Sequence, residues 1–500
     1  MTRTNTDYAT PVRLAMHLRR FRQHALPLAF LTAVSIACFQ TAVALAQTGT
    51  PARVQLTIPA PTGRYDVGTF SLHLVDQGRQ DPYWSTPHPR ELMITLWYPS
   101  RSVGFWELAP WMSPTILAHF RPELESFLST DPGGICAPGQ NCGGGTTCPP
   151  GQTCPGASPA GAAPAVSLAN VDFPITLARH GAPVERSSQR YPVVIYSPGH
   201  AYDREYGTML AIDLASHGYV VVTISHTYEA AEVEFPDRRV ELARVDDPNN
   251  IHTNLALSLR RADVQFVIDK LTALEGGANP DAEHRPLPAG LRGALDLAKI
   301  GIYGHSLGGA TAADAMANDA RIVAGINLDG SFHTETIDPG AMPPPGSPPE
   351  QIAAFIAALN AELSLLGRRI HQPFMIMADS GCHPAPPPGA PASNPDPGCS
   401  PEDFGNLTSV VWQNLGGYKR FVSVVGTTHG SYTDDEWLLN ELAAAGIVSS
   451  PAKWVGTIQQ DRAVAIERAY TRSFFDLWLK NTDDHLLSGP SAQYPEVKFY

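Results

Sequence analysis

A regular alternation of short apolar runs with helical segments, which begins near residue 191, most constrains the fold. The apolar runs are continuous instead of alternating with polar residues. This is typical of strands in a parallel sheet covered by helices on both faces. The predicted strands are residues 91–100, 191–199, 219–226, 298–304, 321–330, 373–381 and 420–430, and the predicted helices are 203–218, 254–274, the segment after the glycines at 308 and 309, and 460–479. We therefore expect an α/β fold with a mostly parallel central sheet.

One predicted strand runs straight into a glycine-rich turn and then into a helix. The turn reads Gly304-His305-Ser306-Leu307-Gly308-Gly309, a G-x-S-x-G pattern that chance alone can supply in a chain of this length. Its strand–turn–helix setting is more specific, because this is the nucleophile elbow of the α/β-hydrolase fold. Gly304, Gly308 and Gly309 leave the room that the strand and helix need to approach each other. We predict that Ser306 is a catalytic nucleophile.

A serine nucleophile needs a histidine base and an acid that orients it. In this architecture they follow the serine in the order acid, histidine, at the carboxyl ends of later strands. His429 ends the last predicted strand, whereas Asp329 and Asp379 both end strands before it. The later strand is the default position of the acid, which favours Asp379, but both aspartates stay open at this point. Other histidines at strand ends could line the pocket; they are His200, His226 and His333.

Four stretches together resemble the secreted-type platelet-activating factor acetylhydrolases, a branch of the α/β-hydrolase fold. They are residues 191–226, 304–312 (GHSLGGATA), 328–330 (LDG) and 426–437 (GTTHGSYTDDEW). The resemblance covers about residues 91–100 and 191–480.

The resemblance implies a specific set of site residues. The family carries its acid on an L-D pair one strand after the nucleophile, and its histidine before an aromatic-Thr-Asp run. These positions match Asp329 and His429, so the implied triad is Ser306, Asp329 and His429, with Asp379 as the alternative acid. The elbow predicts the backbone N–H of Leu307 as one oxyanion donor, and the family position of the second donor matches the N–H of His200.

The first 46 residues are expected to be a cleavable signal peptide. A basic segment precedes a long apolar run that ends in Ala44-Leu45-Ala46, a cleavage signature. An uncleaved anchor helix is the alternative. Export would place the protein outside the cell or in a periplasm.

Removal of that segment makes the remaining chain strongly acidic. The whole chain has 35 basic and 48 acidic residues, of which five arginines and one aspartate lie in residues 1–46, so 30 basic and 47 acidic residues remain, a net charge of −17. Such a surface disfavours nucleic acid and anionic lipid as partners. We expect a small-molecule or lipid ester as substrate and at most transient contact with a lipid surface.

The cysteines suggest surface insertions held by disulfide bonds, and no metal site. Six cysteines follow the signal segment, an even number that suits an oxidising compartment. Those clustered at 136–154 lack a C-x₂-C pair and an interleaved histidine, so we expect neither a metal nor a cofactor there. The clustered cysteines are Cys136, Cys142, Cys148 and Cys154, and we expect a disulfide bond between Cys382 and Cys399 to close a separate loop.

Residues 47–500 are expected to form a single α/β-hydrolase domain with Pro/Gly/Cys-rich insertions. The chain has 46 prolines and 42 glycines, and they cluster. The expected insertions lie at about residues 130–185, 331–370 and 381–400, and the helix in the second is either a lid or a peripheral helix.

These features predict an exported serine esterase that acts through an acyl-enzyme. By resemblance alone, its substrates are short-acyl or phospholipid-type esters. A lipase or a cutinase-like polyester hydrolase is the alternative within the class, and a non-catalytic binding module on the same fold is the alternative outside it. A metal-dependent hydrolase is disfavoured, because the chain contains no H-E-x-x-H motif.

Overall fold

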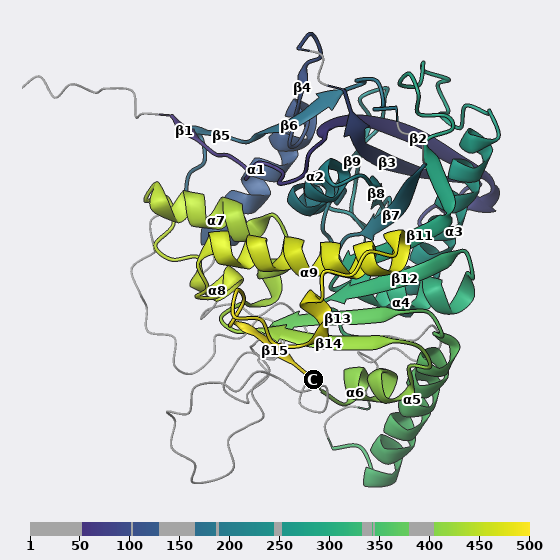
Figure 1. Cartoon of the computed structure of the whole chain (residues 1–500). Helices are drawn as coiled ribbons and strands as arrows, with labels where there is room; N and C mark the ends of the chain where they lie inside the picture. Colours follow the sequence, from purple (N-terminus) through teal and green to yellow (C-terminus); the bar gives the residue numbers. More distant parts are fainter. Residues whose placement is uncertain are drawn as a thin grey trace, which may run out of the picture. The chain divides into compact units, whose positions relative to one another are not determined.

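The computed structural model describes residues 53–101, 104–129, 166–186, 190–244, 253–332, 343, 346–379 and 405–500, all within one compact unit, Ala52–Tyr500 (Figure 1). Several predicted features lie outside these residues. They are the signal peptide at 1–46, all seven cysteines, His333, the loop at 381–400 and most of the insertion that begins near residue 130.

An eleven-stranded sheet forms the centre of this unit. Its strands are β2 (Asp66–Gln80), β3 (Pro89–Ser100), β4 (Leu108–Pro110), β6 (Ile175–His180), β7 (Tyr191–Ser197), β8 (Val220–Ser225), β11 (Leu295–His305), β12 (Ile322–Leu328), β13 (Phe374–Asp379), β14 (Lys419–Val424) and β15 (Val497–Phe499). They lie in the order β15-β14-β13-β12-β11-β7-β8-β3-β2-β6-β4. From β14 to β8 all neighbours are parallel, whereas β15 and β3 pair antiparallel to this block. The expected α/β fold with a mostly parallel sheet is confirmed.

Smaller elements complete the described part of the chain. Two short pairs lie apart from the main sheet: β1 (Val54–Gln55) with β5 (Val171–Asp172), and β9 (Glu232–Glu234) with β10 (Val240–Leu242). The helices are α1 (Pro114–Ser129), α2 (Thr208–Ser216), α3 (Thr253–Glu275), α4 (Leu307–Asn318), α5 (Pro349–Arg369), α6 (Gly405–Asn414), α7 (Asp435–Ala444), α8 (Ala452–Val455) and α9 (Gln460–Lys480), with 3₁₀ turns η1 (Arg204–Gly207), η3 (His429–Tyr432) and η4 (Leu486–Ser488).

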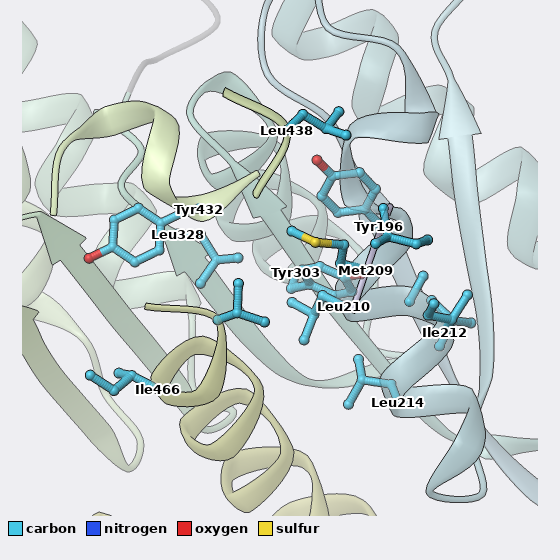
Figure 2. Packing of buried hydrophobic residues seen from close by; sticks show 14 of the residues in the cluster. Tyr196, Met209, Leu210, Ile212, Leu214, Tyr303, Leu328, Tyr432, Leu438 and Ile466 are labelled. Atoms are coloured by element: carbon cyan, nitrogen blue, oxygen red, sulfur yellow. The ribbon is translucent and has the colours of Figure 1, made fainter. Parts of the chain in front are cut away.

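Helices cover both faces of the parallel strands, which explains why most of the residues in those strands are apolar. In β7, Val194 and Tyr196 pack in one hydrophobic cluster with residues of α2 and α9. The intervening Val193 and Ile195 pack in a second cluster with residues of α3 and α4. Figure 2 shows part of the first cluster, including Tyr196 and Met209 of α2. β7 therefore buries side chains in both directions.

The helix of the second expected insertion, α5, packs against the body of the fold. Leu359, Leu363 and Leu366 are buried in the cluster on the α3–α4 face. The two alternatives for this helix, a lid and a peripheral helix, stay predictions.

The register of the parallel strands brings their carboxyl ends to one edge of the sheet. Ser197 of β7 is paired with Gly304 of β11, and His305 of β11 is paired with Leu328 of β12. The residues that follow these positions therefore emerge next to one another. This edge holds the sequence-predicted site residues.

Candidate active site

Ser306 occupies the tight turn between β11 and α4. Its backbone has φ 56° and ψ −124°, a conformation that side-chain-bearing residues rarely adopt. The turn is bonded to the end of β12, because the N–H of Ser306 donates to the carbonyl of Leu328 at 3.0 Å. Strain of this kind is concentrated at functional sites, where the surrounding structure must enforce it.

The three predicted elbow glycines are required by close packing. A Cβ on Gly304 would lie 2.2 Å from the carbonyl carbon of Gly308, and a Cβ on Gly308 would lie 1.9 Å from the carbonyl oxygen of Ser197. A Cβ on Gly309 would lie 2.4 Å from Oδ1 of Asn327. Any side chain at these positions would push the helix away from the strands.

Asp329 and His429 form a close pair at the same edge. Asp329 directly follows β12, and its buried carboxylate Oδ2 lies 2.6 Å from Nδ1 of His429. The other oxygen, Oδ1, accepts the backbone N–H of Asp379 at 2.9 Å. Of the two aspartates that the sequence left open, Asp329 contacts the histidine side chain, and Asp379 contacts Asp329 through its backbone.

This pairing sets the protonation of His429. A carboxylate only accepts hydrogen bonds, so Nδ1 carries the proton and Nε2 keeps its lone pair in the neutral ring. Burial lowers the pKa of His429, but the hydrogen bond and charge of Asp329 outweigh it and raise that pKa above its ordinary value. No hydrogen bond joins Oγ of Ser306 to His429 among these described residues, and such bonds are often long without substrate.

His305, which the sequence did not single out, contacts His429 and positions it. Its ring is fully buried, lies 4.5 Å from the ring of His429, and donates from Nε2 to the His429 carbonyl at 2.8 Å. Burial, with a smaller contribution from the charge of His429, lowers the pKa of His305 to about 3, so the ring is neutral. The motif gives no signal for this role, because the residue before the serine is unrestricted in G-x-S-x-G.

The loop after β7 lies against the elbow. A Cβ on Gly199 would be 3.3 Å from Cβ of Ser306. His200 follows in this loop and is exposed. Leu307 lies at the N-terminus of α4, where backbone N–H groups have no partner within the helix.

A buried guanidinium anchors this loop. Arg260 of α3 is fully buried, and it donates to the carbonyl oxygens of Pro198 at 2.5 Å and Gly199 at 3.1 Å. Its charge is met by Glu229, 2.6 Å away. The Gly199 carbonyl and the His200 N–H belong to one planar trans peptide, so they point in opposite directions. Anchoring the carbonyl on Arg260 therefore fixes the direction of the His200 N–H.

A second serine–histidine–aspartate chain lies wholly in the interior. Oγ of Ser197 is 2.9 Å from Nε2 of His226, whose Nδ1 is 3.0 Å from Asp263. Asp263 also accepts from Arg90, and all four residues are fully buried. Because no substrate can reach these atoms, this chain supports the fold beneath the elbow, and His226 does not line the pocket.

Metal ligands or membrane-spanning helices would indicate other kinds of site. Among the residues that the structure describes, no cluster of three or more His, Cys, Asp or Glu side chains is arranged to hold a metal ion. In the same part of the chain, no helix has the length and apolar character needed to cross a bilayer.

Comparison with known proteins finds relatives among acetylhydrolases and esterases. Residues 165–333 match the family described as platelet-activating factor acetylhydrolase, isoform II. A probable 1-alkyl-2-acetylglycerophosphocholine esterase of Arthroderma benhamiae is 24% identical over 311 residues, which are 62% of this chain and 66% of that protein. The platelet-activating factor acetylhydrolase of Cavia porcellus is 26% identical over 162 residues, 29% of this chain and 36% of that protein.

The solved structures add a similar protein that is matched along most of its length. A ferulic acid esterase from Streptomyces cinnamoneus matches with a TM-score of 0.59 and 29% identity, over 89% of this chain and 99% of that one. Against the two curated relatives, by contrast, the match spans just under two thirds of the first and about a third of the second. The family resemblance expected from the sequence is confirmed.

Proposed function

We propose that this chain, a relative of the platelet-activating factor acetylhydrolases, is a serine esterase that cleaves carboxylic esters through an acyl-enzyme. The observation that carries the proposal is the contact of His429 with Asp329 at the strand edge where the strained turn of Ser306 emerges. The match of residues 165–333 to the family supports it, since that segment contains both Ser306 and Asp329.

In the proposed reaction, Oγ of Ser306 attacks the ester carbonyl while Nε2 of His429 takes its proton. Asp329 holds the imidazole in the required tautomer and stabilises the imidazolium that forms. The proton then passes to the leaving alcohol, and the acyl group stays on Ser306. Water, activated by the same histidine, releases the acid.

The backbone N–H groups of Leu307 and His200 are proposed to stabilise the oxyanion of the tetrahedral intermediate. Such donors are effective because they are already oriented before charge develops. Two features support the assignment: the position of Leu307 at the N-terminus of α4, and the anchoring of the His200 peptide by Arg260.

The proposal covers several classes of ester as substrates. Short-acyl and phospholipid-type esters are suggested by the names of the curated relatives. The name of the solved esterase adds esters of ferulic acid, an aromatic acid. Polyesters stay the alternative.

Export is proposed on the sequence of residues 1–46 alone. Expression of the full chain in a bacterium, followed by N-terminal sequencing of the exported protein, tests it. A mature N-terminus at Gln47 is expected, and retention of residues 1–46 would contradict a cleavable signal.

The esterase proposal is tested by labelling with a fluorophosphonate probe and by hydrolysis of 4-nitrophenyl esters from acetate to palmitate. An acetylated phospholipid, a feruloyl ester and a polyester film complete the panel. We expect labelling that is lost in Ser306→Ala, together with loss of hydrolysis. A folded protein that is not labelled, or a Ser306→Ala variant that is labelled equally, would favour the non-catalytic binding module.

A further inference from the structure

We propose that Asp434 is a positioning residue of the candidate active site, which holds the base His429 at a fixed place relative to the oxyanion loop. The oxyanion loop is residues 198–203, between β7 and η1, and it carries the N–H of His200. This inference rests on the esterase function proposed above. Asp434 belongs to the aromatic-Thr-Asp run that follows the histidine, and the proposed reaction leaves it without a role.

Asp434 lies on the same segment as the base. It directly follows the turn η3, which begins with His429, and directly precedes α7. Between them, Oγ1 of Thr433 donates to the carbonyl of Gly430 at 2.9 Å and accepts the N–H of Asp435 at 3.2 Å. The turn that carries His429 and the start of α7 therefore form one hydrogen-bonded unit. A displacement of Asp434 would move the histidine with it.

The Asp434 side chain caps another helix instead of its own. An aspartate at this position usually accepts an N–H from the first turn of the helix that follows it. Among the described residues Asp434 makes no such bond to α7. Its Oδ1 accepts the N–H of Met209 at 3.1 Å, across 225 residues of sequence. Met209 lies in the first turn of α2, where N–H groups lack partners within the helix and the helix dipole favours a negative charge.

The other contacts of Asp434 reach the turn η1, which directly follows the oxyanion loop. Oδ2 accepts from Nε1 of Trp111 at 2.8 Å, and the same Nε1 lies 3.0 Å from the carbonyl of Glu205 in η1. The backbone N–H of Asp434 donates to the carbonyl of Tyr206, also in η1, at 2.8 Å. One residue thus joins the segment of the base to the segment of the oxyanion loop, through its backbone and both carboxylate oxygens.

These contacts are buried and require an ionised carboxylate. Asp434, Trp111 and Met209 are at most 2% exposed, so water cannot replace a lost partner. Both oxygens accept from N–H donors, which suits the ionised form because that form only accepts hydrogen bonds. Burial raises the pKa of Asp434 to about 7, although the two N–H donors act against this change. Variants are therefore compared at about pH 8.5, where the carboxylate is ionised.

The first test is Asp434→Asn, which keeps the shape of the side chain but turns one accepting oxygen into an NH₂ group. A shift of about 1 Å in catalytic geometry can cost about a hundredfold in rate. We expect kcat for 4-nitrophenyl acetate to fall by about tenfold to a hundredfold with little change in KM. Affinity for a boronic acid that mimics the tetrahedral intermediate should fall in parallel. An unchanged kcat in the folded variant would overturn the proposal.

Asp213→Asn is the matched control for the stability of α2. Asp213 lies in α2 and is fully buried, and its Oδ1 accepts the N–H of Thr62 at 2.7 Å. Thr62 belongs to the segment before β2 and not to the site. The control should lower the denaturation midpoint and leave kcat unchanged. A loss of kcat as large as that in Asp434→Asn would assign the effect to α2 and overturn positioning.

Trp111→Phe is a smaller change, which keeps the proposal testable if Asp434→Asn does not fold. The new ring can still pack against Phe120 and Phe173, as the indole does, but the Nε1–H donor is lost. We expect kcat to fall severalfold at constant KM, and amide hydrogen exchange of residues 199–209 to become faster. An unchanged kcat, or unchanged exchange in this segment, would contradict the link.

Failure of the esterase function is recognised separately. If Ser306 of the original protein does not react with the fluorophosphonate probe, the esterase proposal fails. If Ser306 reacts and the Asp434 and Trp111 variants hydrolyse esters like the original protein, only the positioning role is contradicted.

Discussion

Arg260 and Gly199 are joined across the base of the candidate oxyanion loop, where the buried guanidinium donates to the Gly199 carbonyl at 3.1 Å. The same peptide unit carries the N–H of His200, so this contact fixes the direction of that proposed donor. Arg260 is thus a positioning residue: it touches the loop and not the reacting atoms.

We expect Arg260→Met to lower kcat by about tenfold to a hundredfold with little change in KM, since loss of a whole oxyanion donor costs on the order of 10²–10³. Steady-state kinetics on a 4-nitrophenyl ester measure the split. Affinity for a boronic acid that mimics the tetrahedral intermediate should fall in parallel.

The loss of kcat in Arg260→Met must be distinguished from a loss of protein stability. Removing Arg260 leaves Glu229 buried without its partner, which typically costs about 3–5 kcal/mol. The control is the double variant Arg260→Met/Glu229→Gln, which removes the unpaired charge. A double variant that regains thermal stability but not kcat supports positioning, whereas recovery of both would reduce Arg260 to a structural role.

Asp329 and Asp379 lie at neighbouring strand ends, and we expect their substitution to affect kcat very differently. Asp329→Asn should lower kcat by about 10⁴, as loss of the triad carboxylate does in serine proteases. Asp379→Asn should have little effect, because Asp379 donates to Asp329 through its backbone N–H, which the substitution retains. Kinetics on one ester for both variants decide the question, and the reverse order of effects would restore Asp379 as the acid.

The pH profile should report the Asp329–His429 pair. The proposed base acts in its neutral form, so kcat/KM should rise with pH as His429 loses its proton. Asp329 raises the pKa of His429, and the midpoint should therefore lie above the ordinary histidine value of about 6.5. In Asp329→Asn the residual activity should have its midpoint at lower pH. An unchanged midpoint would show that the contact does not control the titration.

The parallel core of the fold could be predicted because most residues of its strands are apolar and buried on both faces. β7, β8 and β11 to β14 are of this kind, and each overlaps a predicted strand. The last predicted strand was too long, because β14 ends at Val424 and His429 lies in the turn η3 that follows. Among the outer strands, β3 was predicted at residues 91–100, whereas β2, β4, β6 and β15 were not. β2 includes Thr69, Ser71 and His73 between its apolar residues, and its register is set by pairing with β3 rather than by local pattern.

The site was accessible from sequence only where a motif constrains the residue. Ser306 follows from the elbow, whereas Asp329 and Asp379 could not be separated from the residues alone, because both end apolar strands. Their difference depends on the register of β12 against β13. Arg260 lies in an amphipathic helix, where an arginine is ordinarily assigned to solvent. Only the fold shows that it is buried against Glu229 and two carbonyls.

The role of His305 depends on its hydrogen bond to the carbonyl of His429, which is 124 residues away in the sequence. Substitution of His305 tests this role. His305→Gln retains an N–H donor that can reach the carbonyl of His429, whereas His305→Leu leaves that carbonyl without it. An unsatisfied buried polar group costs about 1–3 kcal/mol, and the contact with the His429 carbonyl is part-buried. We therefore expect the leucine variant to unfold at a lower denaturant concentration and to lose activity, and the glutamine variant to keep most of both.

The acid dependence of stability checks the same residue. The pKa of His305 is lowered to about 3 in the folded protein, whereas the unfolded chain binds a proton near pH 6.5. Its neutral ring therefore contributes stability that is complete above pH 6.5 and is lost as the pH falls towards 3. Chemical denaturation from pH 7.5 to 4.5 should show a smaller loss of stability in His305→Gln than in the original protein. Equal losses would mean that His305 does not stay neutral in the fold.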